Sequence, residues 1–199
     1  MSRRILGILA ATAAILISGC EAIPGRQGDA AQPLFSGYTC CNLHYDGEWI
    51  SDANWSSLPM IPAGANIRVL GYGRYRVKAD IDGHRVELGL DYGRQQSLEA
   101  WARKLVVEED PRPKIARMPT PIRDAIRAGK VTIGMTKAEV IMSLGYPPAH
   151  QTPNLDWPQW KYWHTSFGSY LVVWDDAGRV KDVTTDAETR AAVLYQPPR

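Results

Sequence analysis

Alternating apolar and polar residues predict a β-rich N-terminal half. Runs typical of strands occupy residues 42–51, 67–70, 75–81 and 86–90. Asp46-Gly47 and Asp82-Gly83 have the composition of tight hairpin turns. In the last two runs apolar and charged residues alternate, so one face of each strand is expected to be buried and the other to meet solvent. Short strands that follow one another so closely predict a small β-barrel-like domain over residues 36–94.

A helical pattern follows the β-rich region. Ser97 is placed to cap its first turn, and apolar residues recur every three or four positions, at Leu98, Trp101, Ala102 and Leu105. Residues 108–119 are charged and rich in proline, which is typical of a connection between domains. We therefore expect a helix and linker over residues 95–119 and a second domain over residues 120–199.

Two helices open the second domain. The first has Thr120 as its cap and Pro121 at its first helical position, where the missing N–H costs nothing, and Gly129 closes it. The second has a more complete start signal, because Thr136 and Glu139 have the spacing of a capping box.

Three strands complete the second domain, at residues 160–165, 170–174 and 180–184. Two helices followed by three antiparallel strands make a two-layer unit. The expected fold class is therefore α+β, with a C-terminal two-helix plus three-stranded antiparallel sheet and an N-terminal small β-barrel-like domain.

Aromatic residues point to both faces of this predicted sheet. Alternation separates Trp163 from Trp160 along the first strand, and we expect Tyr170 and Trp174 to join Trp163 on the face away from the helices. Such a face is covered either by the rest of the chain or by a partner. Trp163, Tyr170 and Trp174 are therefore candidate partner-binding residues.

The N-terminus has the pattern of a secreted lipoprotein. Two arginines precede an uncharged apolar stretch at residues 5–17, which is typical of a signal peptide over residues 1–19. Ile17-Ser18-Gly19-Cys20 resembles the bacterial lipobox, which implies lipid attachment at Cys20; an ordinary cleavable signal is the alternative. By resemblance to enterobacterial sorting, Glu21 implies the periplasmic face of the outer membrane. Residues 20–35 have the composition of a flexible tether.

Charge and motifs exclude several classes of function. The formal net charge is +2, and it falls to zero without residues 1–19, whose only charged residues are two arginines. A neutral chain argues against a nucleic-acid partner. No apolar run reaches the roughly 20 residues of a membrane span. Because no catalytic or metal-ligand motif is recognisable, we expect no enzyme activity, no metal and no cofactor beyond the covalent lipid.

The adjacent cysteines Cys40 and Cys41 are the most unusual feature. Three interpretations remain open: buried structural thiols, a vicinal disulfide, or a soft-metal site that includes His44.

Basic residues occupy the outward positions of the predicted hairpin at 75–90. Arg76, Lys78 and Arg85 are candidates for binding phosphate head groups or an anionic cell-wall polymer. Charged side chains at such positions are also common where only solvent is met.

The second domain carries a gapped motif: residues 134–140 (GMTKAEV), 144–147 (LGYP) and 160–162 (WKY), followed by Asp176, Gly178, Val180 and Val183. This motif resembles the BamE (SmpA/OmlA) family of small outer-membrane lipoproteins. The resemblance implies an outer-membrane-anchored periplasmic lipoprotein that acts as a binding or scaffold factor for the β-barrel assembly machinery. Residues 61–64 (IPAG) and 71–73 (GYG) are similar to bacterial Src-homology-3-like modules. The alternatives are an envelope-binding module for peptidoglycan or anionic lipid, and a Cys/His metal-binding lipoprotein.

Overall fold

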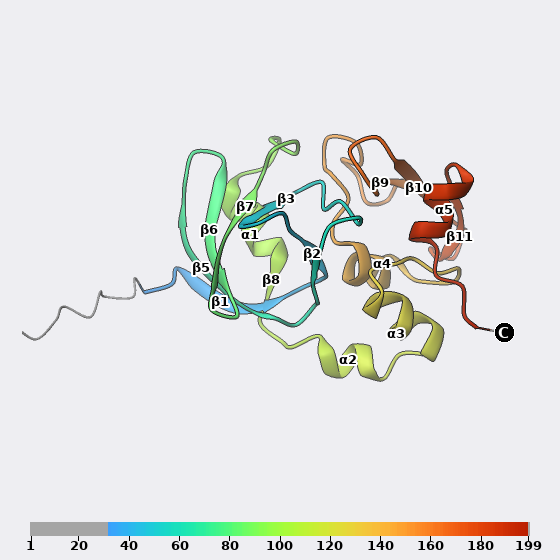
Figure 1. The fold of residues 1–199 in the computed structure, drawn as a ribbon, viewed down its shortest axis with the longest axis horizontal. Helices are drawn as coiled ribbons and strands as arrows, with labels where there is room; N and C mark the ends of the chain where they lie inside the picture. The colour runs from blue at the N-terminus through green and yellow to red at the C-terminus, as the bar shows by residue number, and fades with distance from the viewer. Residues whose placement is uncertain (1–31, 199) are drawn as a thin grey trace, which may run out of the picture. The chain divides into compact units, whose positions relative to one another are not determined.

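The computed structural model describes residues 32–198, which adopt an α+β fold. A six-stranded sheet curls into a half-barrel with helices beside it, and a three-stranded antiparallel sheet followed by a short helix forms the C-terminal part (Figure 1). The expected α+β class is confirmed at this level. The signal peptide predicted over residues 1–19 and the lipid attachment predicted at Cys20 lie outside the described residues.

The six-stranded sheet has the order β3-β7-β6-β5-β1-β8. Its strands are β1 (Phe35–Thr39), β3 (Trp49–Ser51), β5 (Asn66–Tyr72), β6 (Arg76–Ile81), β7 (His84–Gly89) and β8 (Val106–Val107). Neighbours are antiparallel except β3 and β7, which are parallel. Beside this sheet, β2 (Leu43–His44) pairs with β4 (Met60–Ile61).

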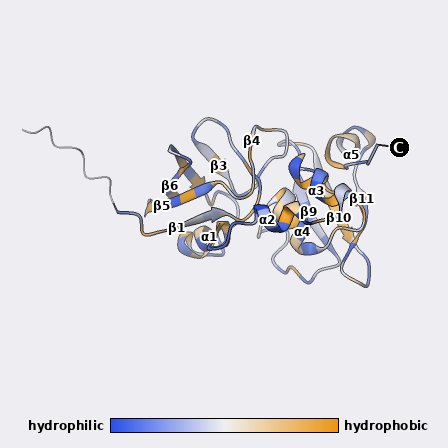
Figure 2. Ribbon diagram, turned by 90° about the horizontal axis from the view of Figure 1, so that it is seen from below, coloured by the Kyte–Doolittle hydropathy of each residue, from blue (hydrophilic) through white to orange (hydrophobic). Residues whose placement is uncertain are grey.

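The β6–β7 hairpin forms as the sequence predicts. Asp82 and Gly83 both have positive φ, 49° and 89°, which is the conformation that a two-residue hairpin turn requires. Val77, Ala79 and Ile81 are buried and alternate with two charged residues, of which Lys78 is exposed and Asp80 is buried and lies 3.2 Å from Arg68. Figure 2 shows this alternation as orange and blue segments along β5 and β6.

The predicted hairpin within residues 42–51 forms only in its turn. Asp46 and Trp49 make a single antiparallel bridge, and beyond it the two strands separate to pair with β4 and β7. Leu43 and Ile50 are both buried in the core of the half-barrel. Burial of these side chains against distant strands outweighs the local hairpin.

Helix α1 (Leu98–Leu105) begins at its predicted cap, because the Ser97 side chain accepts a hydrogen bond from the Ala100 N–H at 3.1 Å. The helix contacts β5 and β6 and buries Trp101, Ala102 and Leu105 in the half-barrel core. The chain then enters β8 directly and pairs with β1. The sequence pattern predicts neither β1 nor β8.

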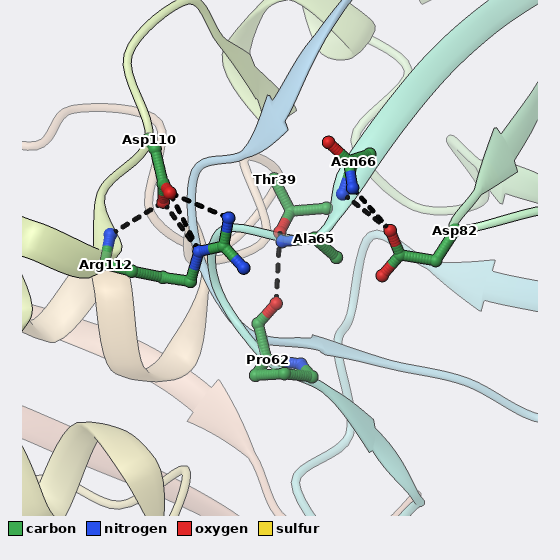
Figure 3. Close-up of polar contacts among 7 residues, drawn as sticks. All are labelled: Thr39, Pro62, Ala65, Asn66, Asp82, Asp110 and Arg112. Carbon is green, nitrogen blue, oxygen red and sulfur yellow. Dashed lines mark hydrogen bonds and ion pairs between the residues drawn. The ribbon is translucent and has the colours of Figure 1, made fainter.

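Residues 108–119 carry more structure than a bare linker (Figure 3). Asp110 accepts hydrogen bonds from the backbone N–H and the guanidinium of Arg112 at 2.9 Å, at the start of α2 (Arg112–Ala116). These bonds lower the pKa of Asp110.

Nearby, the Thr39 hydroxyl donates to the Pro62 carbonyl and accepts from the Ala65 N–H, which fixes the loop leading into β5.

Helices α3 (Thr120–Arg127) and α4 (Lys137–Leu144) follow where the sequence predicts them. The capping box of α4 is complete: Thr136 accepts from the Glu139 N–H, and the Glu139 carboxylate accepts from the Thr136 N–H at 2.7 Å. The predicted cap of α3 is wrong by one residue. Pro119 occupies the cap position, so Thr120 is already helical and caps nothing.

The C-terminal sheet has the order β11-β10-β9, formed by β9 (Gln159–Trp163), β10 (Ser169–Trp174) and β11 (Val180–Thr184). These strands agree with the predicted ones. A further helix, α5 (Ala187–Val193), was not predicted, although Asp186 caps it by accepting from the Thr189 N–H. Its Val193 lies in the same core as α3, α4 and the inner face of the sheet.

Two hydrophobic cores result: residues up to Leu105 form one and residues from Ile115 onward form the other, except that Ala63 belongs to the second core and Tyr146 packs against the first. One lies inside the half-barrel, and the other lies between the C-terminal sheet and its helices. Buried hydrogen bonds between the two cores determine where the loops of both halves meet, and this meeting place forms the candidate site.

Candidate functional site

The C-terminal sheet places its aromatic residues differently from the prediction. The pairing register sets Tyr170 opposite Tyr162 and Val172 opposite Trp160, so these side chains share the inner face. Tyr162 and Tyr170 stack with centroids 5.8 Å apart, and burial raises the pKa of both tyrosines. The prediction of one outer face with Trp163, Tyr170 and Trp174 is therefore wrong. Alternation orders residues within a strand but does not give the register between strands.

Trp174 belongs to the inner face as well. Its ring meets that of Trp160 edge to face, with centroids 4.7 Å apart. Of the three predicted partner-binding residues, only Trp163 lies on the outer face, where it is half-buried.

Two buried asparagines join the half-barrel to the C-terminal helices. The Asn42 amide donates to the carbonyls of Ile126 at 2.7 Å and Ser143 at 3.0 Å, and its oxygen accepts from the Ala63 N–H at 2.9 Å. Asn42 is only 1 % exposed, so its amide satisfies buried carbonyls; the Ile126 carbonyl also accepts from the Gly129 N–H at 3.0 Å.

Asn54 makes the second connection. Its amide donates to the carbonyls of Asn42 and Leu144, and its oxygen accepts from the His44 N–H. Gly145, which ends α4 with φ 76°, lies so close that an added Cβ would be 2.7 Å from the Asn54 amide nitrogen. The loop after β3 is thereby held against the end of α4.

An aromatic hollow opens where the loops of the two halves meet. Its volume is about 280 Å³, and its lining combines aromatic rings with small polar groups: Trp55, Tyr92, His150, Gln151, Trp163 and Ser166. Trp55 follows β3, Tyr92 follows β7, His150 and Gln151 lie between α4 and β9, and Ser166 lies in the β9–β10 turn. We call this feature the aromatic hollow.

A buried carboxylate positions the loop that carries Tyr92. Asp52 is 3 % exposed and accepts hydrogen bonds from the N–H groups of Asp91, Tyr92 and Gly93, the last at 2.6 Å. Burial raises the pKa of Asp52, and these three donors oppose that rise. Asp91 in turn accepts from the Trp49 indole at 3.0 Å, so both carboxylates near the hollow are engaged.

Aromatic rings run in a row to the edge of the hollow. Trp49 meets Trp55 edge to face at 5.4 Å, Trp55 meets Tyr92 in the same way at 6.3 Å, and Tyr92 stacks on His150 at 5.7 Å. Each ring therefore restricts the orientation of its neighbour before any ligand arrives.

Strand β9 supplies the opposite wall. The N–H groups of Ser56 and Ser57 bond to the carbonyls of Trp163 and His164, which fastens the loop after β3 to this strand. The Trp163 indole donates to the Gln151 side-chain oxygen at 3.0 Å, and the Lys161 ammonium lies 4.8 Å from the Trp163 ring centroid.

On the β6–β7 hairpin, the basic residues of the predicted patch have acidic residues beside them. Arg76 lies 3.2 Å from Glu87 and over the ring of Trp49, and Lys78 is opposite Glu87 in the pairing register. Arg85 lies beside a separate hollow of about 510 Å³, whose lining also includes Glu48. The outward face is thus a mixture of both signs of charge.

A disulfide joins Cys40 and Cys41, both of which are buried. His44, which follows shortly after them in the sequence, is also buried. Its Nδ1 forms a hydrogen bond with the Leu58 carbonyl at 2.8 Å. Burial lowers the pKa of His44. Within residues 32–198, no group of three or more His, Cys, Asp or Glu is placed to hold a metal ion.

Among the residues that line the aromatic hollow, only Trp163 is a site residue predicted from the sequence. Trp55 and Tyr92 had a visible signal, because each is a large aromatic residue in a turn segment between two predicted strands or between a strand and a helix. His150, Gln151 and Ser166 had none, since their approach depends on the contacts between the halves.

Comparison with known proteins gives no match to a protein family, a curated protein or a solved structure. In the part of the chain that the structure describes, no helix has the length and apolar character to cross a membrane.

Proposed function

We propose that this chain is an outer-membrane-anchored periplasmic lipoprotein that acts as a binding or scaffold factor in the assembly of outer-membrane β-barrel proteins. The lipobox-like segment that ends at Cys20 supports the location. The BamE-like motif of the C-terminal half supports the role. A function that consists of binding also fits a sequence in which no catalytic motif is recognisable.

The observation that carries the proposal is that the motif residues cap, end and pack against helix α4. Thr136 and Glu139 form the capping box of α4, Gly145 ends that helix with a positive φ, and Trp160 and Tyr162 cover it from β9. These motif residues thus begin, end and cover α4, which supports a BamE-like interpretation of the C-terminal half. A BamE-like domain over residues 120–199, preceded by a small β-barrel-like domain over residues 36–94, is the arrangement that we propose.

The proposal predicts that the β-barrel assembly machinery is recovered with this protein. Full-length protein expressed in its own host is crosslinked mildly in cells and purified under denaturing conditions, and bound proteins are identified by mass spectrometry. A Cys20→Ala variant serves as the control, since it should lose both the anchor and the co-recovered machinery. Recovery of no assembly component, or equal recovery with the variant, contradicts the proposal.

A further inference from the structure

We propose that the aromatic hollow binds an uncharged sugar ring of a glycan. This inference is independent of a role in β-barrel assembly, because it rests on the geometry and chemistry of the hollow alone.

The size and lining of the hollow fit one ring. About 280 Å³ is at the lower end of the range for small-molecule sites, which are mostly apolar with a few well-placed polar groups. A pyranose has the same two-sided character: its C–H face is apolar and packs on aromatic rings, while its hydroxyls need donors and acceptors around the rim. Trp55, Tyr92 and Trp163 supply aromatic surface, and Tyr92 is 46 % exposed.

Polar groups are available at the rim of the hollow. The Gln151 oxygen accepts from Trp163, which leaves the Gln151 NH₂ group as a donor. His150 and Ser166 are exposed and contribute ring nitrogens and a hydroxyl that both donate and accept. Amide, imidazole and hydroxyl groups are hydrogen-bonding partners of the kind that recognise hydroxyl groups.

The charges around the hollow disfavour an ionic ligand. A cation would be repelled by the Lys161 ammonium, which lies 4.8 Å from the Trp163 ring centroid, and the nearby carboxylates of Asp52 and Asp91 already accept hydrogen bonds from backbone N–H groups and from the Trp49 indole. An anion would need a basic cluster, and the lining residues include neither lysine nor arginine. These charges favour a neutral ligand, and the donors and acceptors at the rim favour one that carries hydroxyl groups.

The hollow is also held in shape without a ligand. Asp52 fixes the Tyr92 loop through three N–H groups, and the bonds from Ser56 and Ser57 fix Trp55 against β9. A site whose walls are already ordered loses little conformational entropy on binding, which favours even a weakly interacting sugar.

The test is a titration of full-length protein in a detergent without a sugar head group, such as lauryldimethylamine oxide. The probes are tri-N-acetylchitotriose and maltotriose, with a proline nonapeptide as the competing class of aromatic-site ligand. Calorimetry gives the dissociation constants. We expect saturable binding of at least one trisaccharide and weaker or no binding of the peptide.

Variants locate the binding. Trp163→Ala and Tyr92→Ala should each weaken trisaccharide binding at least tenfold, and Ser166→Trp, at an exposed turn position, should block the hollow without disturbing either core. Trp157→Ala is the matched control, because Trp157 is 45 % exposed and lies outside the lining. Absence of saturable binding to both trisaccharides overturns the proposal. So does binding that survives Ser166→Trp, or binding of the proline peptide alone.

Discussion

The two halves of the molecule differ in how far local sequence specifies them. In the C-terminal half, α3, α4 and the strands β9 to β11 lie close to where the pattern places them, because caps, glycine stops and short turns are encoded within a few residues. In the half-barrel, β1 joins β5 to β8 and β3 pairs with β7 in parallel, and each pairing links distant segments. Local signals identify elements, but pairing between distant strands is decided by the shared core.

The largest expected effect tests the C-terminal core. Trp160 is fully buried against Trp174, and its indole donates to the Leu155 carbonyl at 3.1 Å. Trp160→Ala should destabilise the protein by about 3–5 kcal/mol, the usual result of removing a large buried aromatic side chain. Urea denaturation followed by circular dichroism measures this. The exposed Trp157→Ala should stay within about 0.5 kcal/mol, and equal losses in the two variants would contradict the assignment of the core.

The next effect tests whether the halves unfold together. Asn42→Ala leaves the Ser143 carbonyl and the Ala63 N–H without their Asn42 partner and removes one of the two donors to the Ile126 carbonyl, and should cost about 3 kcal/mol. The same change should separate a single unfolding transition into two, since it removes a buried connection. Denaturation followed by near-ultraviolet and far-ultraviolet circular dichroism shows whether the probes diverge. The exposed Asn154→Ala is the control; a single transition of unchanged midpoint in Asn42→Ala would show that the connection is not needed.

The same contrast explains what the sequence reveals about the candidate site. Trp163 is predictable as an outward aromatic residue because its strand is identified by local alternation. Its partners in the aromatic hollow come from loops after β3, β7 and α4, and these loops are brought together by hydrogen bonds between distant residues, among them those of Asn54 and Asp52. For Tyr170 the strand is predicted correctly, but the side chain lies on the inner face of the sheet and not on the predicted outer face. Both errors arise from register and packing between distant segments.

A smaller effect compares a real helix cap with an apparent one. Thr136→Ala removes the acceptor of the Glu139 N–H and should cost about 0.5–2 kcal/mol. Thr120→Ala should change stability by no more than about 0.5 kcal/mol, since Pro119 holds the cap position of α3. Midpoints and slopes of urea denaturation distinguish the two substitutions. Equal losses would mean that Thr120 caps its helix as the local sequence pattern suggests.

The smallest effect near neutral pH comes from His44, which lies in the half-barrel. Burial lowers the pKa of His44 below its ordinary value of 6.5, so above pH 6.5 the folded and unfolded states both hold it neutral. As the pH falls below 6.5, His44 becomes protonated in the unfolded chain but stays neutral in the folded one. The free energy of unfolding therefore decreases until the pH reaches the pKa of His44 in the folded state. We therefore expect His44→Gln to flatten the decline in denaturation midpoint between pH 7 and about 5. The exposed His84→Gln should keep the slope of the wild-type protein. Because the carboxylates are shared by all three proteins, the difference between the curves isolates the histidine, and parallel curves for His44→Gln and the wild type would show that His44 titrates alike in both states.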